Sequence, residues 1–142
     1  MGLSRVFWDT NLFIYLFEGA GEKADRVAAL RSRMLDRRDE LLTSTLTIGE
    51  ILVKPVQAGR MDLARLYEQR IAQVATIVPF DLDAARSYAS VRTNTGIKGA
   101  DAIQIACASA AGANLFITND ERLGGRSFLG IDFIVSLARV PL

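Results

Sequence analysis

Four acidic residues of this sequence lie among apolar residues, where a carboxylate is least expected. Asp9 interrupts the stretch "RVFWDTNLFIYLF", and Glu50 lies within "LTIGEILV". Asp101 is the only charged residue over positions 99–119, and Asp120 closely follows the apolar run "LFIT". An isolated carboxylate in an apolar interior is strongly destabilising unless it is paired, hydrogen-bonded or bound to a metal ion. These four positions are therefore the first candidates for chemistry.

Each of these acids also has a local structural explanation. Asp9 could cap the N-terminus of a following helix. The spacing of Thr47 and Glu50 matches a capping box, in which the glutamate accepts a hydrogen bond from the amide of the capping residue. Asp101 in a first helical turn would complement the helix dipole, and Asp120 could be another cap. Taken singly, each local explanation is at least as good as a functional one.

The residue types that are missing limit the chemistry further. The chain has no histidine and a single cysteine, Cys107. Ser-His-Asp and Cys-His nucleophiles are therefore excluded, as are zinc sites built from histidine and cysteine. An enzyme of this composition must use carboxylates, hydroxyls, lysine or arginine, or a hard metal ion held by oxygen atoms. A single cysteine also excludes an intrachain disulfide, which fits a reducing cytoplasm.

Alternating strand and helix patterns predict the scaffold that positions the acids. Apolar runs predict strands at residues 5–8, 40–44, 76–80, 114–118 and 131–135. Helical periodicity predicts helices at 11–18, 22–38, 47–58, 61–74, 81–93 and 99–111, the third of them interrupted or ended near Pro55. Such alternation favours an α/β fold with a mainly parallel sheet and helices on both faces. A length of 142 residues suits a single domain, residues 1–142.

In such a sheet the four acids fall near one edge. Asp9 and Asp120 follow strands, Glu50 and Asp101 lie near helix starts, and the ligand crevice of open α/β sheets lies at the carboxyl ends of the strands. Two like charges 4 Å apart repel by about 4 kcal/mol at an effective dielectric constant of 20, so gathered carboxylates take up protons or recruit cations. Oxygen ligands select Mg²⁺ or Mn²⁺, and such an ion activates water for phosphate-ester hydrolysis. From the residues alone, a nuclease and a phosphatase are equally open.

The overall composition is that of a globular chain with little net charge. Half of the residues are hydrophobic and the net charge is +1, so binding of a polyanion must come from a local patch. The N-terminus has no basic region followed by a long apolar stretch, so we expect neither a signal peptide nor a membrane span. The expected location is the cytoplasm.

The order of the short motifs resembles a known family. A strand followed by "DTN", a helix with "T-x-x-E-I-L", the segment "GADAIQIACA" and the segment "LFITNDERL" occur in that order between residues 6 and 123. This set is similar to the PIN-domain ribonucleases, and most similar to the VapC toxins of bacterial and archaeal toxin–antitoxin pairs. The resemblance implies a single PIN-like domain with a five-stranded parallel sheet of order 3-2-1-4-5.

The resemblance also implies a site, a cofactor and partners. The family's catalytic and metal-binding carboxylates correspond to four acids of this chain: Asp9, Glu50, Asp101 and Asp120. Its supporting polar positions correspond to Asn11 and Thr118. The implied activity is that of a Mg²⁺- or Mn²⁺-dependent endoribonuclease, the toxin of a type II pair, which cleaves RNA with metal-activated water. The implied assembly is a homodimer inhibited by a small, DNA-binding, VapB-like antitoxin.

Three cations flank the acidic segments and could contact RNA phosphates: Lys98, Arg122 and Arg126. Two other functions stay open. A PIN-like domain that has lost turnover could act as a binding or regulatory subunit with a DNA-binding antitoxin. A phosphoacceptor receiver domain has a similar size and alternation, but it needs an acidic pair after the first strand and a lysine after a late strand. Neither feature is present.

Overall fold

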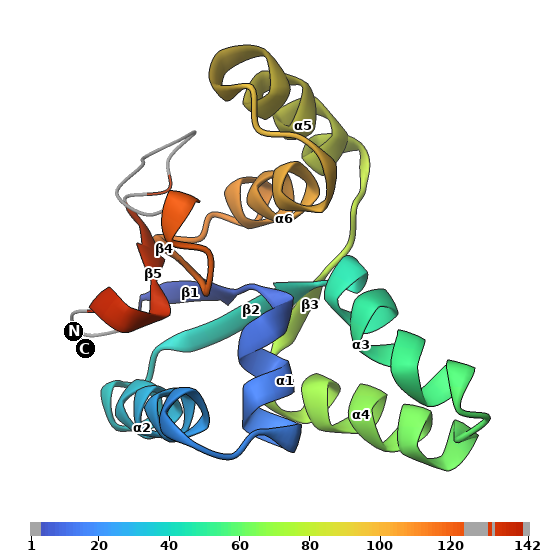
Figure 1. The fold of residues 1–142 in the computed structure, drawn as a ribbon. Helices are drawn as coiled ribbons and strands as arrows, with labels where there is room; N and C mark the ends of the chain where they lie inside the picture. The colour runs from blue at the N-terminus through green and yellow to red at the C-terminus, as the bar shows by residue number, and fades with distance from the viewer. Residues whose placement is uncertain (1–3, 124–130, 132, 141–142) are drawn as a thin grey trace.

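Short strands alternate with helices along the chain, and the computed structural model describes residues 4–123, 131 and 133–140 (Figure 1). The strands are β1 (Arg5–Trp8), β2 (Glu40–Ser44), β3 (Thr76–Val78), β4 (Leu115–Thr118) and β5 (Phe133–Ser136). The α-helices are α1 (Thr10–Glu18), α2 (Glu22–Arg37), α3 (Thr45–Gln57), α4 (Met61–Val74), α5 (Leu82–Thr95) and α6 (Gly99–Ala110). Two short 3₁₀ helices, η1 (Glu121–Leu123) and η2 (Leu137–Arg139), follow β4 and β5. No helix in the described ranges has the length and apolar character needed to cross a membrane.

The strands form one parallel sheet in the order β3-β2-β1-β4-β5, which confirms the predicted order. β1 is central, with Val6 opposite Leu41 of β2 and Leu115 of β4. The chain moves outward from β1 to β3 and then returns to the other side of β1 as β4. This return places a topological switch between β1 and β4, where open α/β sheets form a ligand crevice. The order also differs from the 2-1-3-4-5 order of receiver domains, so that alternative is wrong.

Two hydrophobic clusters cover the two faces of the sheet. Successive strand residues point to opposite faces, so Trp8 packs with α1–α4 on one face and Phe7 packs with α5 and α6 on the other (Figure 1). The rings of Trp8 and Phe13 lie 5.3 Å apart between centroids, and those of Phe7 and Phe116 stack at 5.2 Å. Packing on both faces therefore fixes the strand ends that precede Asp9 and Asp120 and the helices that carry Glu50 and Asp101.

Helix α3 begins two residues before its predicted start. The Ser44 side chain accepts a hydrogen bond from the Thr47 N–H at 3.4 Å and caps the helix. Glu50 therefore lies inside the helix, in its second turn, and the capping box predicted at residues 47–50 is wrong. Pro55 does not interrupt the helix, which ends two residues later at Gln57, so of the two predicted outcomes the structure shows an end near the proline.

Other boundaries differ from the predicted ones by one or two residues. β3 ends at Val78, directly before Pro79, because proline has no N–H to donate to a neighbouring strand. α5 continues to Thr95 and ends at Gly96, whose φ of 75° is the left-handed conformation that glycine adopts without strain. β5 lies at Phe133–Ser136 rather than at 131–135. These shifts leave Asp9 and Asp120 just beyond the ends of their strands.

Replacing Phe116 with alanine tests the packing beneath α5 and α6. The ring is fully buried and stacked on Phe7, so the substitution should lower the free energy of unfolding by about 3–5 kcal/mol. Phe80 is the matched control, because it is 44% exposed and its loss should cost on the order of 1 kcal/mol. Urea denaturation measures both changes, and equal losses would contradict the described packing.

Candidate active site

Asp9 is anchored at the carboxyl end of β1 by donors from two elements. Its backbone is extended, with φ −67° and ψ 161°, and one carboxylate oxygen accepts a hydrogen bond from the Thr10 N–H at 2.8 Å. This contact is the predicted helix cap. The other oxygen accepts a hydrogen bond from the Thr118 hydroxyl of β4 at 2.9 Å. The Asp9 N–H donates to the Ile117 carbonyl at 3.0 Å. Asp9 is therefore held by the neighbouring central strand as well as by its own helix.

A buried amide, which sequence reasoning missed, joins the two helical layers at this point. Gln104 of α6 is 1% exposed, and its Nε2 donates to the Thr47 hydroxyl at 2.8 Å and the Thr10 hydroxyl at 3.2 Å. The same nitrogen lies 3.5 Å from an Asp9 oxygen, and the Gln104 carbonyl accepts a hydrogen bond from the Ser44 hydroxyl. A sequence signal exists, since Gln104 follows Asp101 by three residues and is the one amide among the apolar residues 102–108. A buried amide needs hydrogen-bond partners, and here those partners surround Asp9.

Glu50 reaches the same group of side chains from α3. Its residue is exposed, yet one carboxylate oxygen accepts a hydrogen bond from the Thr10 hydroxyl at 2.5 Å. Thr10 is itself buried and lies beside Asp9. Thr10 thus links the two acids, because its N–H donates to Asp9 and its hydroxyl donates to Glu50.

Burial and like charge raise the pKa of two of the acids. The pKa of Asp9 lies above its ordinary value because burial penalises the charged form, although the hydrogen bonds from Thr10, Thr118 and Gln104 lower it. The charge of Glu50 raises the same pKa further. These opposing effects leave a carboxylate that is hydrogen-bonded but has no ion pair with any basic side chain in the described part of the chain.

The pKa of Asp101, on helix α6, is also raised by burial and by neighbouring acids. The residue lies in the first turn of α6, as predicted, and is half-buried. Burial raises its pKa, and the charges of Asp9 and Asp120 raise it further, while Arg122 lowers it. Acids far apart in the sequence are therefore close enough to repel one another.

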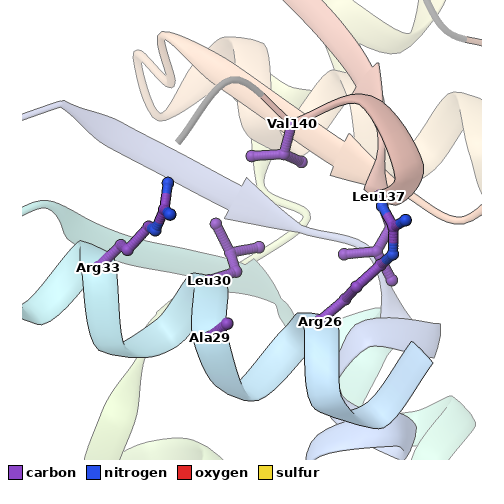
Figure 2. Close-up of a pocket in the computed structure, with 6 residues that line it drawn as sticks. All are labelled: Arg26, Ala29, Leu30, Arg33, Leu137 and Val140. Atoms are coloured by element: carbon purple, nitrogen blue, oxygen red, sulfur yellow. The ribbon is translucent and has the colours of Figure 1, made fainter. Parts of the chain in front are cut away.

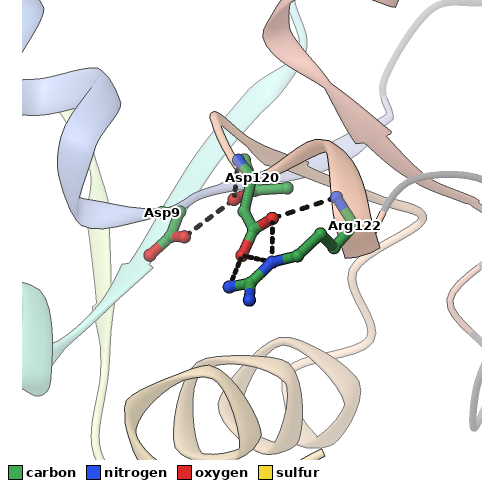
Figure 3. A network of polar contacts seen from close by, with 4 residues as sticks. Asp9, Asp120 and Arg122 are labelled. Carbon is green, nitrogen blue, oxygen red and sulfur yellow. Dashed lines mark hydrogen bonds and ion pairs between the residues drawn. The ribbon is translucent and has the colours of Figure 1, made fainter.

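Asp120 differs from the other acids because a cation holds it. The Arg122 Nη2 donates to one carboxylate oxygen at 2.6 Å, and the Arg122 Nε lies 2.9 Å and 3.2 Å from the two oxygens (Figure 3). This contact holds the pKa of Asp120 below its ordinary value. The Asp120 N–H also donates to the Thr118 hydroxyl at 3.0 Å. Thr118 therefore connects Asp120 to Asp9.

Three of the four remaining predicted positions are exposed residues that lie close in the chain to these acids. Asn11 is exposed in the first turn of α1, and its side chain makes no hydrogen bond to the described residues of the site. Lys98 is exposed and precedes the first residue of α6, near Asp101. Arg122 is exposed in η1 and paired with Asp120. Arg126 lies outside the described residues.

The donor chemistry of the acidic edge suits a hard cation, but its side chains do not form a finished coordination shell. Carboxylates and threonine hydroxyls are the ligands preferred by Mg²⁺ and Mn²⁺. Among the described residues, no three Asp, Glu, His or Cys side chains are grouped in a way that could hold one ion. The charges interact in pairs instead, Glu50 with Asp9, Asp9 with Asp101, and Asp101 with Asp120. The acidic edge therefore carries enough negative charge to attract a cation. To coordinate a single ion, its carboxylate side chains would have to move closer together.

Hollows of the described surface beside α2 contain none of the four acids. One, of about 170 Å³, lies between α2 and the segment that follows β5 (Figure 2). It is lined by Arg26, Ala29, Leu30, Arg33, Leu137 and Val140. A neighbouring hollow of about 180 Å³ shares Arg26 and Leu137 and extends to Asn119. The first lining is basic and apolar, and the second contains a single acid beside two basic residues, so neither gathers the carboxylates that a divalent cation needs.

Comparison with known proteins identifies the fold. A family model for the PIN domain matches residues 6–128. A VapBC2 complex from Rickettsia felis bound to a promoter DNA fragment superposes with a TM-score of 0.69 and 15% identity, over 83% of this chain and 89% of that one. A toxin–antitoxin complex from Klebsiella pneumoniae superposes with a TM-score of 0.63 and 22% identity, over 96% of this chain and 100% of that one. A DNA-bound VapBC from Salmonella typhimurium superposes with a TM-score of 0.71 and 16% identity, over 95% of this chain and 99% of that one. No curated protein matched the sequence.

Replacing Asp9 with asparagine should stabilise the protein at neutral pH in the absence of divalent cations. The folded-state pKa of Asp9 is raised, so the charged carboxylate lowers stability once the pH exceeds its ordinary value of 3.8. The variant removes this cost, and its advantage should shrink as the pH falls and vanish below 3.8, where the wild-type side chain is protonated in both the folded and the unfolded state. Urea denaturation at pH 7 and at pH 4 measures the difference.

The control for this substitution is Asp120→Asn. The pKa of Asp120 is lowered by Arg122, so the charged form stabilises the folded protein and its removal should not increase stability. An Asp9→Asn protein that is less stable than the wild type at pH 7 would contradict the assigned electrostatics.

Replacing Gln104 with leucine should destabilise the protein through the hydrogen bonds it leaves unmade. Leucine fills a similar volume, but the Ser44 and Thr47 hydroxyls lose a buried partner, and the free energy of unfolding should fall by about 1–3 kcal/mol. Gln69→Leu on the exposed face of α4 is the control and should change it by about 0.5 kcal/mol or less. Equal effects in thermal denaturation would show that the amide does not bind the two layers together.

Proposed function

This chain belongs to the PIN domain family, and we propose that it is a divalent-metal-dependent endoribonuclease, the toxin of a type II toxin–antitoxin pair. The observation that carries the proposal is the series of repelling carboxylates at the switch between β1 and β4. The repulsion within such a series destabilises the ionised carboxylates, and a bound cation would offset that repulsion. The solved relatives with the same fold are toxin–antitoxin complexes, which supports the assignment to a toxin.

We infer that the cofactor is Mg²⁺ or Mn²⁺. Four carboxylates would hold it: Asp9, Glu50, Asp101 and Asp120. A bound ion of this kind would supply neutralisation of phosphate charge and acidification of water. The chain has no histidine to serve as a general base, so this contribution replaces the one that imidazole makes in other nucleases.

The chain's own residues keep Asp9 aimed at the reaction centre. The Thr10 N–H and the Thr118 hydroxyl each bond one of its carboxylate oxygens, and Gln104 holds the Thr10 hydroxyl in place. These donors favour the ionised form, which opposes the effect of burial. Asp9 is therefore a ligand whose orientation is fixed by hydrogen bonds to both of its oxygens.

Basic side chains beside the acids would bind the RNA backbone. Lys98 stands at the start of α6, one turn or less from Asp101, and its exposed ammonium can reach a phosphate. We assign the same role to Arg122 and Arg126. An arginine guanidinium forms two parallel hydrogen bonds to a phosphate, which suits it to orient the scissile group.

We also propose a VapB-like antitoxin and a second copy of the chain as partners, with the protein acting in the cytoplasm. The relatives of similar fold were solved as toxin–antitoxin complexes, two of them with DNA. Large apolar side chains of the α3–α4 pair are exposed and would favour protein contacts: Val53, Val56, Met61 and Leu66.

A second function is favoured by one observation. Asp120 is neutralised by Arg122, and no three carboxylates of the described residues converge on one ion. A PIN domain that keeps this arrangement would act as a binding or regulatory subunit beside a DNA-binding antitoxin, without turnover. A cleavage assay with pure protein and Mn²⁺ separates the two functions.

The test of the proposed activity is RNA cleavage by Asp9→Asn. The variant should fold but lose cleavage, because the remaining acids no longer surround the cation. Wild-type cleavage should require Mg²⁺ or Mn²⁺ and stop in EDTA. Asp62→Asn, at an exposed acid paired with Arg60, is the control and should cleave like the wild type. Full cleavage by Asp9→Asn, or undiminished cleavage in EDTA, would refute the proposal.

A further inference from the structure

Arg122 holds Asp120 with three of its nitrogen atoms. Its Nε and Nη2 contact both carboxylate oxygens, and its backbone N–H donates to one of them at 2.9 Å (Figure 3). The two residues lie on one turn, at the start of η1, so the contact forms locally and needs no other element. The carboxylate that would complete a metal site is thereby occupied by a cation of the same chain.

Of the four acids, Asp120 alone forms an ion pair with a described residue. The other ion pairs between described residues involve Glu22, Glu40, Asp39, Asp62 and Asp83. None of them involves Asp9, Glu50 or Asp101. Within the described part of the chain, a basic side chain therefore neutralises the acidic edge at Asp120 alone.

We propose that Arg122 is a displaceable counter-ion that competes with the divalent cation for Asp120 and so sets the affinity of the site for that cation. This inference rests on the proposed function, since it takes the acidic edge to be a metal site. Arg122 is a positioning residue here: it acts on the cation through Asp120 and does not bind the cation itself.

The exposure of the pair explains why a cation can displace the arginine. The Arg122 side chain is 85% exposed and that of Asp120 is 25% exposed, so the guanidinium regains its hydration when it leaves. A divalent cation near Asp101 gains the attraction of several carboxylates at once, whereas Arg122 contacts only one. The released guanidinium then lies beside the site with all its donors free for a phosphate.

The test measures Mn²⁺ affinity directly, in metal-free buffer without RNA, by electron paramagnetic resonance of the unbound ion. Arg122→Ala should bind Mn²⁺ more tightly than the wild type, by up to about fivefold, which is the most that an exposed ion pair usually contributes. Arg60→Ala breaks an exposed Asp–Arg pair of the same two-residue spacing, far from the acidic edge in the sequence, and should leave the affinity unchanged.

A second control separates direct competition from a general loss of positive charge. Lys98→Ala removes a cation near Asp101 that has no ion pair among the described residues. If the loss of a positive charge near the acids were the whole effect, Lys98→Ala would tighten Mn²⁺ binding as much as Arg122→Ala does. Equal gains would overturn the inference, and a gain confined to Arg122→Ala would support it.

The remaining outcomes distinguish this inference from the proposed function. Equal Mn²⁺ affinity of the wild type and a folded Arg122→Ala protein would overturn the competition while leaving the metal site intact. No Mn²⁺ binding by either protein would overturn both. Circular dichroism confirms folding, and if Arg122→Ala unfolds, Arg122→Lys takes its place, since it keeps the charge and loses the guanidinium's planar fork.

Discussion

The burial of the Asp9 carboxylate at the end of β1 constrains the whole carboxyl edge of this sheet. A half-buried carboxylate requires donors for both oxygens, and here they come from the first residue of α1 and the last residue of β4. The second donor is within reach only because β1 and β4 are neighbours, which the order β3-β2-β1-β4-β5 provides. The return of the chain from β3 to β4 thus creates the crevice and also supplies the hydroxyl that holds its central acid.

The same constraint extends to the helices on both faces. Gln104 reaches across from α6, and Thr47 and Glu50 approach from α3, so that hydroxyls and one amide connect the two layers at the site. Buried polar groups of this kind stabilise a fold only when each has a partner, and here they share partners. The arrangement explains why packing alone does not define the edge. The helices are placed by apolar clusters, but their register at the site is fixed by hydrogen bonds.

The sequence was most informative where an apolar run was bounded by polar residues or was interrupted by a single charge. Strands 5–8 and 40–44 were predicted correctly because short apolar runs are bounded there by polar residues, and the four acids were found because they interrupt such runs. Gln104 was missed because an uncharged amide does not disturb the apolar pattern of α6. The start of α3 was misplaced because Ser44 both ends a strand and caps the helix. The Arg122 contact depends on the 3₁₀ turn at η1, whose geometry no side-chain periodicity predicts.

A comparison with Asp39 shows why the charge of Asp9 is difficult to explain by structure alone. The Asp39 side chain is fully buried, and the fold balances it in the ordinary way, with the Arg37 guanidinium at 3.2 Å and the Ser4 N–H at 3.1 Å. Asp9 caps a helix, a role that asparagine or serine performs equally well without a charge. It has no basic partner among the described residues, and neighbouring Glu50 makes its ionised form still less favourable. A carboxylate kept at such a cost, where a neutral side chain would serve the fold better, is best explained by a function that needs its charge.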